Sequence, residues 1–97
     1  MLRVTDDILE VRHWAEERGA CPCRDAQGRI GLCFGDRVDV ALVGWDEFEP
    51  SFVLGRRVLV YDDAPDCRHH FIGTQEEARA YVAAADPRLT GAAEGTP

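Results

Sequence analysis

The feature that most restricts the fold is a change of hydrophobic period at Gly19. Residues on one side of a helix recur every three or four positions, and the segment before Gly19 has this spacing. Its apolar stripe consists of Ile8, Val11, Trp14, Ala15 and Arg18, while Glu10, Glu16 and Glu17 face away. From Ala20 to Val43 the period is two, as in a strand. The chain therefore predicts a helix followed directly by strands.

Both ends of this helix carry boundary signals. Thr5, Asp6 and Asp7 offer oxygens to the unpaired N–H groups of the first turn, and Asp7 with Glu10 is a variant of the capping-box spacing. Gly19 supplies the left-handed residue with which helices commonly end. The first helix is thus expected to end at Arg18.

Three strands are expected after the helix. Ala20 to Arg24 and Arg29 to Phe34 flank a turn at 25–28 that ends in glycine, which predicts a hairpin. Pro22 places the first of these strands at an edge or at a strand start, because proline cannot donate to a ladder. After a second turn at Gly35-Asp36, the third strand is expected from Val38 to Val43.

The second half of the chain supplies two helices and two strands. Trp45 begins a helix that we expect to be one short turn, or to break near Glu49, because Pro50 falls inside it. Strands at 58–61 and 67–72 flank an acidic turn at 62–66. Thr74, with Glu77 three residues later, is a capping box that begins the last helix.

These elements predict an α+β protein with the order α-β-β-β-α-β-β-α. We expect one mostly antiparallel sheet of about five strands, with two main helices and one short helix. The first and last helices are expected to pack on one face of the sheet. Residues 1–85 form a single domain, and residues 86–97, rich in Gly, Ala, Thr and Pro, are expected to be a disordered tail.

The charge balance argues against several partners. The 97 residues carry 11 cations, all arginine, and 18 acids, for a net charge of −7. Phosphate-rich surfaces are bound by basic stripes, and Arg56-Arg57 is too short to form one, so we expect neither nucleic acid nor membrane as a partner. No run approaches the ~20 apolar residues of a membrane span, and residues 1–10 lack the pattern of a signal peptide. We expect a cytoplasmic protein, monomeric or homodimeric.

Three short segments carry a resemblance. They are Trp14 to Gly19 (W-A-E-x-R-G), Trp45 to Phe48 (W-x-x-F), and Leu59-Val60-Tyr61 followed by an acidic turn (L-x-Y-x-D). The chain resembles a family of small uncharacterised prokaryotic proteins in which these segments recur in this order. The likeness covers about Thr5 to Gly73 and leaves the cysteines and the last helix outside the pattern. It implies a compact bacterial α+β domain with no established activity.

Cysteine and histidine are the residues with the most chemical potential. Cys21 and Cys23 are two apart and share one face of a strand, Cys33 lies opposite Cys21 if the hairpin shifts by one residue, and Cys67 pairs with His69 on another strand. Four such ligands would make a tetrahedral zinc site. The alternatives are thiols buried in the core or at an edge, and a cross-strand disulfide, which a reducing compartment disfavours.

A nucleophilic cysteine is a further alternative. Cys67, Arg68, His69 and His70 bring the required residue types together, but on a strand Arg68 and His70 would point away from Cys67 and His69. Catalysis is therefore disfavoured.

Trp45 and Phe52 are the remaining binding candidates. Both flank the helix that Pro50 interrupts, so an exposed aromatic pair there would form a protein-interaction patch. Because no catalytic constellation is complete, the sequence favours a non-catalytic binding or protein-interaction module with an unknown protein partner and no cofactor. The alternatives are a zinc-binding protein and a thiol-dependent enzyme.

Overall fold

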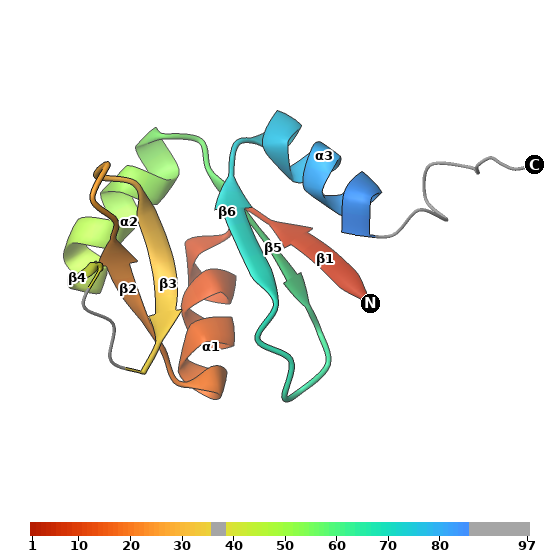
Figure 1. Ribbon diagram of the computed structural model, residues 1–97, viewed down its shortest axis with the longest axis horizontal. Helices are drawn as coiled ribbons and strands as arrows, with labels where there is room; N and C mark the ends of the chain where they lie inside the picture. The colour runs from red at the N-terminus through yellow and green to blue at the C-terminus, as the bar shows by residue number, and fades with distance from the viewer. Residues whose placement is uncertain (36–38, 86–97) are drawn as a thin grey trace, which may run out of the picture.

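The computed structural model describes residues 1–35 and 39–85. Within them, three helices accompany two antiparallel sheets of three strands each (Figure 1). The first sheet has the order β1 (Leu2–Thr5), β5 (Val58–Asp62), β6 (His70–Gly73), and the second has the order β3 (Ile30–Phe34), β2 (Ala20–Arg24), β4 (Ala41–Leu42). The helices are α1 (Ile8–Arg18), α2 (Trp45–Leu54) and α3 (Gln75–Ala85). The α+β class predicted from the sequence is confirmed.

The first strand, β1, was not predicted. It pairs antiparallel with β5, with Arg3 opposite Tyr61, and the Arg3 guanidinium lies 2.9 Å from the Asp63 carboxylate. Four residues are too short a stretch for their alternation to give a strong local signal, and the ladder with a distant strand holds this segment extended. With β1 present, the strands divide into two sheets of three rather than one sheet of about five.

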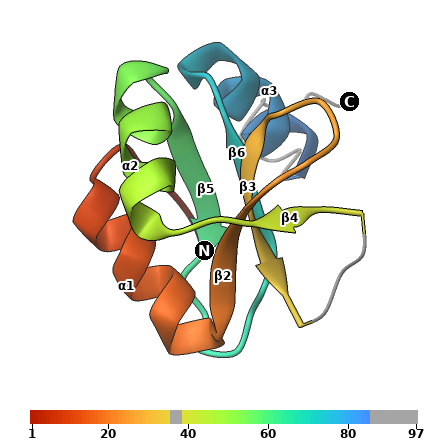
Figure 2. The same cartoon turned by 90° about the vertical axis from the view of Figure 1, so that its left-hand side faces the viewer.

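The β5 strand is buried on both faces. Leu59 and Tyr61 point to a core that also contains the buried residues of α1, β2, β3 and α2, while Val58 and Val60 point to a second cluster with Ala78 of α3. Helices α1 and α2 therefore cover one face of this sheet and α3 covers the other (Figure 2). The prediction that the first and last helices share one face is wrong. The first four residues of β5 are all apolar, so both faces of the strand are hydrophobic and each must pack against a helix.

The predicted ends of α1 and the predicted start of α3 are confirmed, and each depends on local contacts. Asp7 caps α1 by accepting from the Leu9 N–H, and Gly19 ends it with φ 74°. Thr74 and Glu77 exchange the two hydrogen bonds of a capping box at the start of α3. Glu10, by contrast, does not face away from the core, because its carboxylate accepts hydrogen bonds from two hydroxyl groups of the first sheet.

The second helix continues through Pro50 for ten residues, so the predicted break near Glu49 is wrong. Proline deprives the Asp46 carbonyl of its helical donor, but both residues lie on the exposed side of α2, where water can substitute. Phe48 and Phe52, on the opposite side, are fully buried and hold the helix in place.

Two predicted strands are shorter than expected. The strand expected at 38–43 is observed only at Ala41–Leu42, and Val38 lies outside the described residues, as does the expected tail at 86–97. The strand expected at 67–72 begins instead at His70. No helix in the described part of the chain is long and apolar enough to cross a membrane.

Candidate functional site

The two sheets meet along their edge strands, β3 and β6, which lie side by side (Figures 1 and 2). At one end of this junction the rings of Phe34 and His70 are in contact, with their centroids 5.7 Å apart. Toward the other end lies a cleft of about 310 Å³, which the β2–β3 hairpin, the end of α2 and the start of α3 surround. Its polar side chains are Arg24, Arg29, Ser51, Arg57 and Glu77.

The Arg24 guanidinium fixes one wall of the cleft. It lies 2.6 Å from the Glu47 carboxylate and donates to the Gly28 carbonyl and the Ser51 hydroxyl, both at 2.7 Å. These bonds tie the hairpin turn to α2. Since three protein acceptors already hold it, Arg24 acts as a positioning residue for the cleft.

Arg29 and Arg57 are held much more loosely. The Arg29 Nε atom is 3.4 Å from the Asp25 carboxylate, and an Arg57 Nη atom is 4.0 Å from the Glu77 carboxylate. Charge-assisted hydrogen bonds are about 2.7–2.9 Å long, so neither contact satisfies its guanidinium. The Arg29 side chain is 75% exposed and that of Arg57 is 37% exposed, which leaves both able to turn toward a ligand.

Arg57 enters the cleft through a tight reversal after α2. The backbone N–H of Arg57 donates to the Phe52 carbonyl, and the backbone of Arg56 takes the left-handed conformation, with φ 52°. This is a Schellman ending in which arginine replaces the usual glycine. Gly55 is required for a different reason: a Cβ there would lie 2.7 Å from the Ser51 carbonyl oxygen and 3.3 Å from Arg57 Nε.

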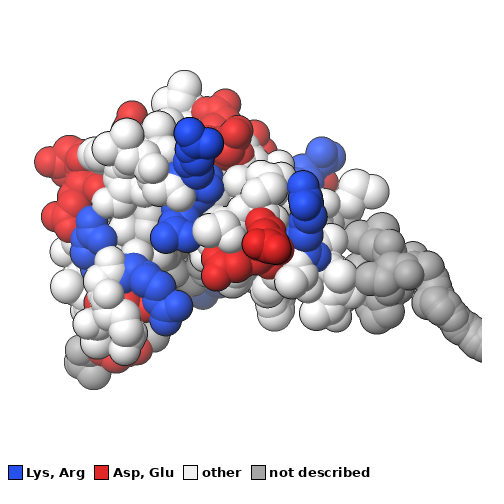
Figure 3. Space-filling view, turned by 90° about the horizontal axis from the view of Figure 1, so that it is seen from above, with Lys and Arg blue, Asp and Glu red and all other residues white. Residues whose placement is uncertain are grey.

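Glu77 is the carboxylate that lines the cleft together with both arginines. The pKa of Glu77 is lowered from its ordinary value, first by the hydrogen bond from the Thr74 N–H and then also by the charges of Arg57 and Arg29. Figure 3, which views this end of the molecule, shows arginines running across the middle of the face beside a few carboxylates. On a protein of net charge −7, the cleft itself is lined by three arginines and one carboxylate.

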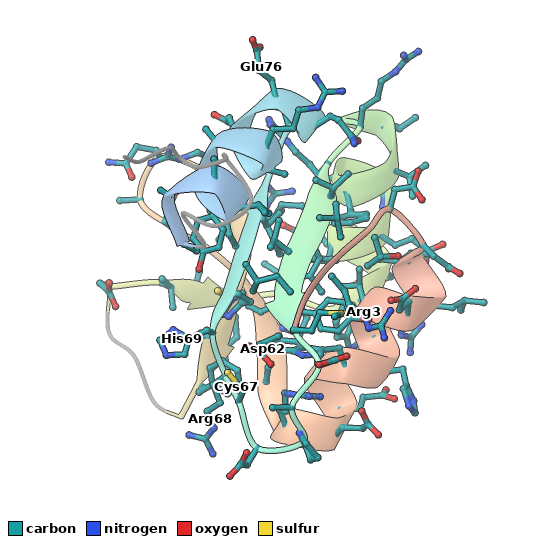
Figure 4. All side chains as sticks on the ribbon, turned by 90° about the vertical axis from the view of Figure 1, so that its right-hand side faces the viewer. Arg3, Asp62, Cys67, Arg68, His69 and Glu76 are labelled. Atoms are coloured by element: carbon teal, nitrogen blue, oxygen red, sulfur yellow. The ribbon has the colours of Figure 1, made fainter. Side chains whose placement is uncertain are left out.

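The structure brings together only part of the predicted zinc ligands. Cys21 lies opposite Cys33 in the β2–β3 ladder, and Cys23 lies two residues along the same face. Cys67 and His69 belong to the segment that leads into β6 in the other sheet, where His69 is exposed (Figure 4). Among residues 1–35 and 39–85, no three histidine, cysteine or acidic side chains are arranged to hold a metal ion.

The predicted interaction patch does not exist as a pair of exposed rings. Phe52 is fully buried and stacks on Phe48, so it cannot contribute to a surface. Trp45 is half-buried, with its ring at 5.1 Å from Phe48 and beneath the Arg12 guanidinium. The large apolar side chains that α2 does expose are those of Val53 and Leu54.

The residues that carry the family resemblance have structural roles. Trp14 is 2% exposed and packs against Phe34, Tyr61 and His70. Arg18 donates to two carbonyls of the β5–β6 connection. Trp14 and Arg18 therefore hold α1 against both sheets.

The arginine cleft escaped the sequence analysis because its residues come from three separate segments. In the sequence, only the adjacent Arg56 and Arg57 indicate a concentration of positive charge, and two residues are too few to predict a binding site. Comparisons with models of known protein families, with curated proteins and with solved structures found nothing that matches this chain.

Proposed function

We propose that this protein is a small non-catalytic binding module that holds an anionic ligand in the cleft between β3 and β6. The observation that supports this proposal is the convergence of Arg29 and Arg57, two loosely paired guanidinium groups, on one concave site of about 310 Å³. Guanidinium groups recognise carboxylates and phosphates through pairs of parallel N–H donors. A volume near the lower end of ligand pockets, about 300–1,000 Å³, suits a small molecule or a single side chain.

Glu77 limits the charge of this ligand. Its carboxylate lies beside Arg57 and repels a second negative charge, but it can accept a hydrogen bond from a hydroxyl or amine. Phe71 and Ile72 add an apolar wall. The best-fitting ligand thus has one acidic group, a hydrogen-bond donor and a small apolar part.

The test is a titration of the isotope-labelled protein with inorganic phosphate and with acetate, followed by NMR at constant ionic strength, with chloride as the reference. We expect the backbone amides of Gly28 and Gly73, which line the cleft, to shift with either probe and not with chloride. Arg29→Gln and Arg57→Gln should each weaken binding about 10-fold or more, since hydrogen bonds to charged groups contribute about 1.5–3 kcal/mol.

Two further variants sharpen the result. Glu77→Gln keeps a side chain that serves in a capping box and removes a negative charge, so it should tighten binding of both probes. Arg79→Gln, on the exposed side of α3, should bind as the unmodified protein does. Equal shifts with chloride, or unchanged binding by both cleft variants, would refute the proposal.

A further inference from the structure

We propose that Cys21 and Cys33 form a redox-active dithiol that reacts with low-molecular-weight disulfides, such as glutathione disulfide, to give a reversible bond between β2 and β3. This site is separate from the arginine cleft. The two cysteines lie toward the end of the hairpin remote from the 25–28 turn, whereas the cleft includes that turn.

The register of the hairpin places the two thiols together. Cys21 and Cys33 are direct partners in the antiparallel ladder, so their side chains leave the same face of the sheet. The Asp25 N–H donates to the Arg29 carbonyl, which makes this pair a hydrogen-bonded one, and by alternation Cys21–Cys33 is one too. Such pairs have Cα atoms about 5.5 Å apart, within the range of about 4.4–6.8 Å that a disulfide spans.

The spacing also favours a bond that is easily reduced. The Cβ atoms of facing residues are about 4.5–5.5 Å apart, while a relaxed disulfide brings them to about 3.8 Å. Formation of the disulfide therefore pulls β2 and β3 closer than the spacing that their backbone hydrogen bonds prefer, which strains the bond. Strained disulfides are the labile ones, which suits a reversible modification better than a permanent crosslink.

Burial determines the order of the steps. Cys21 is exposed and Cys33 is 2% exposed, so the incoming disulfide meets Cys21. The Cys21 thiolate attacks one sulfur of the oxidised reagent, which forms a mixed disulfide and releases one reduced thiol. The Cys33 thiolate then attacks the Cys21 sulfur, which forms the cross-strand bond and releases the second thiol. Two protein thiols are oxidised and one disulfide is reduced to two thiols, with the two protons passing to the products.

The other two cysteines do not share this arrangement. Gly31, which carries no thiol, lies opposite Cys23 in the same ladder. Cys67 lies in the connection between β5 and β6, in the other sheet. The Cys21–Cys33 pair is therefore the one that the strand register assigns to disulfide exchange.

The test exposes the reduced full chain to glutathione disulfide under anaerobic conditions, followed by peptide mapping with mass spectrometry. The unmodified protein should lose two hydrogens and yield a Cys21–Cys33 linked peptide, which reduced glutathione reverses. Cys33→Ser should stop at a stoichiometric glutathione adduct on Cys21, and Cys21→Ser should leave Cys33 unmodified while the protein is folded. Cys67→Ser is the matched control and should behave as the unmodified chain.

Three outcomes overturn the proposal. They are a glutathione adduct that persists on Cys21 in the unmodified protein, a linked peptide that contains a different cysteine pair, and a Cys21–Cys33 bond that forms only in denaturant. Circular dichroism of each variant before oxidation verifies that the chain is folded, so that a failure to react reports on the dithiol and not on a loss of structure.

Discussion

Replacement of Arg18 by alanine should destabilise the protein more than any other substitution of an arginine. The Arg18 side chain is only 5% exposed, although it lies in the last turn of a surface helix. Its guanidinium donates to the Cys67 carbonyl at 2.8 Å and to the Ala64 carbonyl at 2.7 Å, and it covers the Trp14 ring at 4.9 Å. This one group therefore ties α1 to the connection between β5 and β6.

The magnitude follows from these contacts. Each of the two hydrogen bonds from the charged donor contributes about 1.5–3 kcal/mol and the cation–π contact about 0.5–2 kcal/mol, so Arg18→Ala should lower the free energy of unfolding by about 3.5–8 kcal/mol. Domains of this size are stable by about 5–15 kcal/mol in total. Arg18→Lys keeps the charge but reaches at most one of the carbonyls, and should lose about half as much.

Urea unfolding, followed by circular dichroism, measures the loss, with the exposed Arg79→Ala as the control. Hydrogen exchange at the Cys67 amide, which donates to the Ala64 carbonyl at 3.1 Å, should accelerate in Arg18→Ala beyond what the global loss explains. The reasoning fails if Arg18→Ala lies within about 1 kcal/mol of the control, because hydrogen bonds of this kind are worth more than that when they are buried.

Three other predictions follow from individual contacts. Burial first, and then the hydrogen bond to a carboxylate, raise the pKa of Tyr61 to about 12 from 10.0. The unfolded chain releases this proton first, so the contribution of Tyr61 to the free energy of unfolding should be constant up to about pH 10 and fall as the pH rises toward 12. Tyr61→Phe should remove this part of the fall and Tyr81→Phe should keep it, as measured by urea unfolding across this range. Pro50→Ala restores a helical donor at an exposed position and should raise the free energy of unfolding by about 1–2 kcal/mol, and a loss of stability would contradict this. Trp14→Ala should cost about 3–5 kcal/mol, whereas Trp14→Phe should cost less because it keeps a large ring and sacrifices no hydrogen bond, the indole N–H being buried with no partner among the described residues; a loss as large as that of Trp14→Ala in thermal unfolding would contradict this.

The register of the β2–β3 hairpin shows where prediction from sequence stopped. The sequence predicts its turn and its two strands. Whether Cys21 lies opposite Cys33, however, depends on a shift of one residue in the pairing of the two strands, which the sequence does not determine. In the structure Asp25 holds the turn by accepting from the Gln27 and Arg29 N–H groups, and this sets the register. The structure separates the predicted zinc ligands for a related reason, since Cys67 and His69 lie in the connection that leads into β6, at the other sheet.

The sequence by itself determined the local structure: the ends of α1 at Asp7 and Gly19, the hairpin turn at 25–28, and the capping box of Thr74 and Glu77. Each of these depends on a hydrogen bond or a backbone angle within a few residues, so its signal lies in a short stretch of chain.

Only the tertiary structure decided the rest. The ladder between β1 and β5, the cover on both faces of β5, and the convergence of Arg29 and Arg57 join residues that are far apart along the chain. Such contacts form because the apolar area buried by the whole fold fixes the elements relative to one another, and no short segment carries that information. The candidate site belongs to this second class, because its arginines come together only when the two sheets do.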